Sequence, residues 1–183
     1  MQPDHIVTLE DVPKLEHWIK NISNNPNQSI KPMTTDILLN NGVEKNNLKE
    51  VLTYALACVC INSWGKVDQN IYLNYSVITS RKRKTSNIKA ALLHELGHVL
   101  TLPTIFKSKS YPSPLFYLSN EQIQGIQEFE AHKFALKTTC KLGMEKERKE
   151  LLNWKKSFLY SSNSFKSLPF KIAGALMSQL SID

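Results

Sequence analysis

The sequence predicts an α+β fold that is mostly helical and contains one small sheet. Apolar residues recur three or four positions apart over 47–63 and over 86–101, which is typical of helices with one buried face. Between these segments a strand is expected at 67–79, because residues 70–78 alternate at Ile71, Leu73 and Tyr75 and are rich in β-branched and aromatic types. The chain has 183 residues, enough for one domain with a buried core.

The N-terminal part of the chain predicts one short helix followed mostly by loop. Residues 1–22 are expected to hold a helix, with Asp11 as its cap and Pro13 in its first turn. Its inward face is expected to consist of Leu15, Trp18, Ile19 and Ile22. Residues 23–35 are rich in Asn, Ser and Pro, which favours a loop, and residues 35–39 are expected to form a short strand or turn.

The helix expected at 47–63 is amphipathic, with Asn47 as its cap and Gly65 just beyond its end. It contains Cys58 and Cys60, which would face different ways on a helix because they are two residues apart. We therefore expect these cysteines to be buried free thiols and not a pair of metal ligands. Three cysteines in the whole chain do not make a disulfide framework.

The second half of the chain predicts a series of helices. The helix at 86–101 should end before Pro103, and the Pro-rich, aromatic segment 103–118 should be a loop. A long helix should then begin at a capping box of Ser119 and Gln122 and stop at Gly143. Further helices are expected at 144–160 and 167–180. We expect one domain over 1–183, with a core region at about 47–142 and a helical extension over 143–183.

The most informative motif is HExxH, which reads His94, Glu95, Leu96, Gly97, His98. Two histidines four residues apart lie on the same face of a helix, so both imidazoles can bind one Zn²⁺ ion. The glutamate after the first histidine can take a proton from a water on that ion. His94 and His98 are thus candidate metal ligands, and Glu95 is a candidate general base.

A third metal ligand must come from elsewhere, because catalytic zinc normally has three protein ligands and leaves one position to water. The candidates are Glu128 and Glu130, about thirty residues after the motif. On a helix Glu128 shares a face with Ala131, His132 and Ala135, and small side chains there suit close packing against the first helix. This favours Glu128 and leaves Glu130 as the alternative.

HELGH followed by ExEAxxFA resembles the minimal glutamate-type zincins, a class of metallopeptidases that includes ImmA/IrrE-like peptidases and soluble HtpX-like peptidases. The resemblance covers roughly residues 65–142. It implies a minimal zincin-like metalloprotease domain with Glu128 as the third ligand. It also implies that the strand at about 67–79 is an edge strand, beside which an extended peptide substrate can bind.

The sequence departs from these families at His132, where they usually carry Asp or Asn as a partner of a zinc histidine. An imidazole can still form such a hydrogen bond, so His132 is a candidate for orienting a ligand.

In the 103–118 loop, Tyr111 and Tyr117 are candidate donors to a developing oxyanion.

Charge is distributed unevenly: residues 1–80 have net charge −2 and residues 81–183 have +9. The densest basic run is Arg81 to Lys84, which we interpret as a solvated connecting loop or as an electrostatic attractor for an acidic substrate or nucleic acid. No run approaches the ~20 apolar residues that span a bilayer, and the N-terminus lacks the features of a secretory signal. We therefore expect a cytoplasmic protein without a membrane partner.

The sequence thus predicts a zinc-dependent endopeptidase that acts on a protein or peptide. The alternative is a regulatory or adaptor protein of the same fold, which would bind protein or nucleic acid through its basic C-terminal half. Glu95 favours the enzyme, because a purely structural zinc site does not need a general base.

Overall fold

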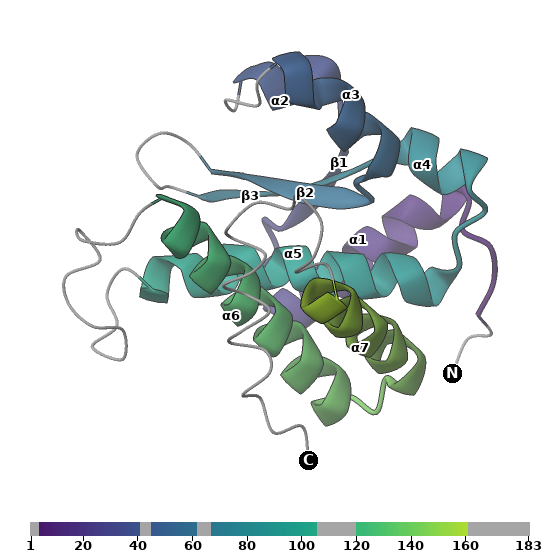
Figure 1. Cartoon of the computed structure of the whole chain (residues 1–183). Helices are drawn as coiled ribbons and strands as arrows, with labels where there is room; N and C mark the ends of the chain where they lie inside the picture. The colour runs from purple at the N-terminus through teal and green to yellow at the C-terminus, as the bar shows by residue number, and fades with distance from the viewer. Residues whose placement is uncertain (1–3, 41–44, 62–66, 106–119, 161–183) are drawn as a thin grey trace.

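A three-stranded mixed sheet forms the centre of the molecule (Figure 1). The structure is a computed structural model that describes residues 4–40, 45–61, 67–105 and 120–160. The strands are β1 (Ser29–Pro32), β2 (Ala57–Ile61) and β3 (Val67–Leu73), in the order β1-β3-β2. β1 is parallel to β3, and β2 is antiparallel to β3.

Helices lie on both sides of this sheet, which confirms the predicted α+β class with its helical majority. In chain order they are the short 3-10 helix η1 (Leu9–Asp11), α1 (Val12–Ser23), α2 (Thr35–Asn40), α3 (Lys45–Tyr54), α4 (Tyr75–Ser80), α5 (Thr85–Ile105), α6 (Asn120–Lys141) and α7 (Glu145–Tyr160). No helix in the described ranges is both long and apolar enough to cross a bilayer.

The two faces of the sheet pack against two separate hydrophobic clusters, because successive side chains of a strand point in opposite directions. Ile71 and Leu73 belong to the larger cluster, which also contains residues of α1, α5, α6 and α7. Tyr72 and Cys60 belong to the smaller cluster, together with residues of α2 and α3. The larger cluster fixes α5 beneath β2 and β3, and α5 carries the HExxH motif.

The predicted strand at 67–79 is correct only as far as Leu73. Asn74 caps α4: its side-chain oxygen accepts a hydrogen bond from the Val77 backbone N–H at 3.2 Å. The segment 75–79 is therefore helical. The expected edge position is also wrong, because β3 is the central strand and β2 lies at one edge of the described sheet.

The predicted helix at 47–63 is wrong in its second half, since α3 ends at Tyr54 and β2 follows. A short apolar run fits a helix and a buried strand equally well. In this chain the run pairs with β3, so it forms a strand. Cys58 and Cys60 consequently lie on the same face of β2. Both are free thiols as predicted; Cys60 is buried and Cys58 is half-buried.

Other element boundaries also differ from the sequence predictions. The expected loop at 23–35 contains β1, and the segment 35–39 is helical in α2. The helix expected at 86–101 is α5, which continues through Pro103 to Ile105. The predictions for Ser119, Tyr111, Tyr117, most of the 103–118 loop and the helix at 167–180 lie outside the described residues.

Several predictions for the helices are confirmed. α1 buries Leu15 and Ile19, and Trp18 and Ile22 pack against the same core. α7 agrees with the helix expected at 144–160. Gly143 lies just beyond α6 with φ of 62°, the left-handed conformation that ends many helices, as predicted.

Candidate metal centre

Two helices of the larger hydrophobic cluster carry the candidate metal ligands. α5 is apolar on most of its surface and is buried between the sheet and α6, which explains why its histidines are buried as well. His94 and His98 are 7% and 6% exposed, and their ring centroids lie 4.9 Å apart. This is the arrangement expected for two residues one helical turn apart.

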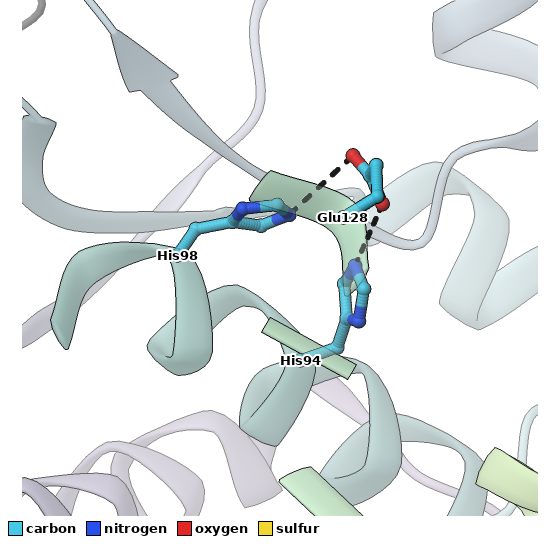
Figure 2. A group of neighbouring side chains, drawn as sticks. All are labelled: His94, His98 and Glu128. Atoms are coloured by element: carbon cyan, nitrogen blue, oxygen red, sulfur yellow. Dashed lines mark hydrogen bonds and ion pairs between the residues drawn. The ribbon is translucent and has the colours of Figure 1, made fainter. Parts of the chain in front are cut away.

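Glu128 of α6 completes the group, as Figure 2 shows. Its two carboxylate oxygens face the two imidazoles: Oε2 lies 3.1 Å from Nε2 of His94, and Oε1 lies 3.5 Å from Nε2 of His98. One ligand atom from each residue falls within 4.8 Å of the other two. The three side chains therefore converge on one point from two helices.

These distances fit a metal ion held between the three side chains. Zinc bonds to nitrogen and oxygen of about 2.0–2.2 Å in a tetrahedral arrangement place ligand atoms about 3.3–3.6 Å apart. Of the two distances from Glu128 to the imidazoles, 3.5 Å lies within that range, and 3.1 Å is slightly shorter because this pair forms a hydrogen bond. The His94–His98–Glu128 group is therefore close enough to bind a metal ion.

The charge state of Glu128 also suits a ligand. Burial disfavours its charged form, but hydrogen bonds and charge interactions with His94 and His98 outweigh burial and hold its pKa well below the usual range. The carboxylate is thus ionised at neutral pH, as a metal ligand must be.

Glu95 has a different environment from Glu128. Burial raises the pKa of its carboxyl group to about 7, the nearby charge of Glu128 adds to this, and His94 opposes it. The Val59 backbone N–H of β2 donates a hydrogen bond to the Glu95 carboxylate, which also favours the charged form. A cation bound nearby would lower the pKa of Glu95 from this raised value, because positive charge favours the carboxylate.

The alternative ligand Glu130 lies elsewhere on α6. Its Oε1 is 3.2 Å from Nζ of Lys133, one turn along the same helix. Within the part of the chain that the structure describes, the candidate metal-binding group of His94, His98 and Glu128 does not include Glu130. His132 is fully buried, and its ring centroid lies 5.8 Å from that of His94, so its side chain adjoins the site.

Two residues near the site were not predicted from the sequence. The sequence predicts a helix at Val59, although the β-branched, apolar run around it is typical of a strand as well. Trp154 of α7 lies 6.3 Å from His94 between ring centroids, and no local pattern links residues sixty positions apart.

The basic run from Arg81 to Lys84 connects α4 and α5, which agrees with its interpretation as a connecting loop.

Comparison with known proteins gave no match to any protein-family model, curated protein or solved structure. The assignment of function therefore depends on the chemistry of the site itself.

Proposed function

We propose that this protein is a zinc-dependent metallopeptidase. The observation that carries the proposal is the convergence of His94, His98 and Glu128 on one point, with Glu95 next to the first ligand in the chain. Two imidazoles and one carboxylate are a ligand set used by catalytic zinc sites, and three protein ligands leave one position open. A structural zinc site would more commonly be closed by four Cys or His ligands.

Zinc bound here would act as a Lewis acid, lowering the pKa of a water ligand and polarising the carbonyl group under attack. Glu95 is the general base: one of its carboxylate oxygens takes the proton from the attacking water and later gives it to the amine nitrogen that leaves. A general base must accept a proton and later donate it, and burial raises the pKa of Glu95 towards the neutral range, while a bound cation would lower it again. The Val59 N–H fixes the carboxylate by its hydrogen bond.

The position of β2 supports a peptide as the substrate. β2 lies at an edge of the described sheet, and its Val59 contacts Glu95. An extended peptide that paired with such an edge would run past the general base. We therefore place the scissile bond beside β2, in a substrate without regular secondary structure.

The substitution Glu95→Gln tests this proposal. The amide has the size of the carboxylate but cannot take a proton, so the variant should keep its zinc and lose cleavage of an unfolded protein such as casein by about 10²–10⁴-fold. Glu130→Gln is the matched control, because it makes the same change on α6 outside the metal-binding group, and it should keep both properties.

Cleavage by Glu95→Gln at the wild-type rate would contradict the mechanism. Absence of cleavage by the zinc-loaded wild-type protein, together with salt-sensitive binding of DNA by the zinc-free protein, would instead favour the regulatory alternative.

A further inference from the structure

The C-terminal helix α7 contributes to the surroundings of the metal-binding group. It packs against both α5 and α6, which carry the three candidate ligands (Figure 1). Its Leu151 is completely buried in the larger hydrophobic cluster, and Trp154 packs against the same cluster. Leu151 and Trp154 therefore hold α7 beside the two helices that carry the candidate ligands.

The ring of Trp154 approaches the imidazole of His94 edge-on. The two ring centroids are 6.3 Å apart, and the ring planes make an angle of 79°. His132 and His98 lie against the same imidazole, at 5.8 and 4.9 Å between centroids. Such edge-to-face contacts are the preferred geometry of aromatic rings, so three rings enclose the imidazole of His94.

The second nitrogen of His94 lacks its usual support. A metal-bound imidazole commonly donates its other N–H to a carboxylate or carbonyl group, and this bond fixes the orientation of the ring. Nδ1 of His94 is buried and has no hydrogen-bond partner among the described residues. The hydrogen bond between Nε2 of His94 and Oε2 of Glu128, at 3.1 Å, holds one edge of the ring. No hydrogen bond among the described residues supports the Nδ1 edge, so packing of neighbouring side chains must do so.

We propose that Trp154 is a positioning residue that holds the His94 imidazole in its metal-binding orientation by ring packing, in place of the usual second hydrogen bond. This inference rests on the proposed function, because it assigns a role at the same site. It also gives α7 a function in metal binding. Without the indole, the imidazole has room to rotate. Binding of the ion would then cost rotational entropy of the ring and weaken the affinity for the ion.

Zinc affinity is the property that distinguishes positioning from a merely structural role. We would measure it by competition with a chromophoric chelator in the full chain for Trp154→Leu and Trp154→Phe. Leucine fills part of the space without an aromatic ring, and affinity should fall about 10–100-fold, as for the loss of other groups that orient a ligand. Phenylalanine restores an aromatic edge and should restore most of the affinity.

Trp18→Leu is the matched control. Trp18 also packs, partly buried, against the larger cluster, but it lies on α1 beside Lys89, whose Nζ is 5.1 Å from its ring centroid. This variant should lose stability like Trp154→Leu and keep wild-type zinc affinity. Equal zinc affinity in the wild-type protein and Trp154→Leu would overturn the inference and leave the proposed function intact, whereas a wild-type protein that does not bind zinc would overturn both.

A second measurement applies if Trp154→Leu does not fold. In a chain carrying Trp18→Phe and Trp64→Phe, Trp154 is the remaining tryptophan, and Co²⁺ binding should quench its fluorescence through close contact with the site. Quenching that saturates at about one ion per chain is the expected result. Unchanged fluorescence on Co²⁺ binding would overturn the inference.

Discussion

Gly97 of α5 lies directly against the backbone of Ala131 of α6. A Cβ atom on Gly97 would lie 2.5 Å from the Ala131 carbonyl oxygen and 2.7 Å from its Cα atom. Gly97 immediately precedes His98, and Ala131 is one turn along α6 from Glu128. This close approach of the two helices therefore lies beside the candidate metal-binding group, and we infer that it limits how far Glu128 lies from the histidines.

Gly97→Ala should push α6 away from α5 and weaken metal binding. The added methyl group meets backbone atoms, which cannot move aside as a flexible side chain can, so we expect a loss of about 1–3 kcal/mol in the free energy of unfolding. The separation of Glu128 from the imidazoles should also lower zinc affinity. Urea unfolding and zinc competition measure these two effects.

Gly143→Ala is the control for this change. Its φ of +62° makes alanine strained, but an added Cβ has open space, so stability should fall by about 1–2 kcal/mol with no change in zinc affinity. Wild-type zinc affinity in Gly97→Ala would mean that the helix contact does not position Glu128.

Asn74→Ala should destabilise the fold where β3 ends and α4 begins. The Asn74 side chain is buried; its oxygen caps α4 at Val77, and its amide donates a hydrogen bond to the Leu52 carbonyl at 2.9 Å. Loss of the cap and of the hydrogen bond to the Leu52 carbonyl should lower the free energy of unfolding by about 1–3 kcal/mol. Asn74→Ser retains a capping oxygen and should recover part of this loss in urea unfolding, whereas equal stability of all three proteins would contradict the capping role.

Glu16→Gln should reduce stability at neutral pH and have little effect in acid. Glu16 accepts hydrogen bonds from Lys20 at 2.7 Å and from the Ile30 backbone N–H at 3.0 Å, which ties α1 to β1. The bond from Lys20 contributes most to lowering the pKa of Glu16 from its ordinary value of 4.5, burial opposes the shift, and the bond from Ile30 adds to it.

A lowered pKa in the folded state stabilises the protein above the unfolded-state pKa, and this contribution disappears as the pH falls through the folded-state value. The difference in unfolding midpoint between wild-type and Glu16→Gln should therefore shrink from neutral pH to acid pH. Glu10→Gln, a change at an exposed residue of η1, is the control and should show no such difference. A pH-independent difference for Glu16→Gln would contradict the role of its charge.

The prediction that His94, His98 and Glu128 lie close together is confirmed, because their spacing follows from helix geometry. His94 and His98 are one turn apart on one helix, and the alanines around Glu128 indicated which face of α6 packs closely. The contact at Gly97 could not be predicted, since it depends on how two helices far apart in sequence approach each other.

The errors in the predicted fold lie in segments whose short-range patterns fit two structures. The apolar run in β2 reads as helix or strand, and β1 is too short to form a recognisable pattern. Val59 and Trp154 reach the site only through long-range packing, so neither could be assigned to it from sequence.

The most direct test of the metal centre is the zinc content of the purified native protein, measured together with Glu128→Ala and Glu130→Ala. We expect about one zinc per chain in the native protein and in Glu130→Ala, and loss of zinc in Glu128→Ala. A native protein without zinc, or full zinc occupancy in Glu128→Ala, would contradict the metal centre proposed here.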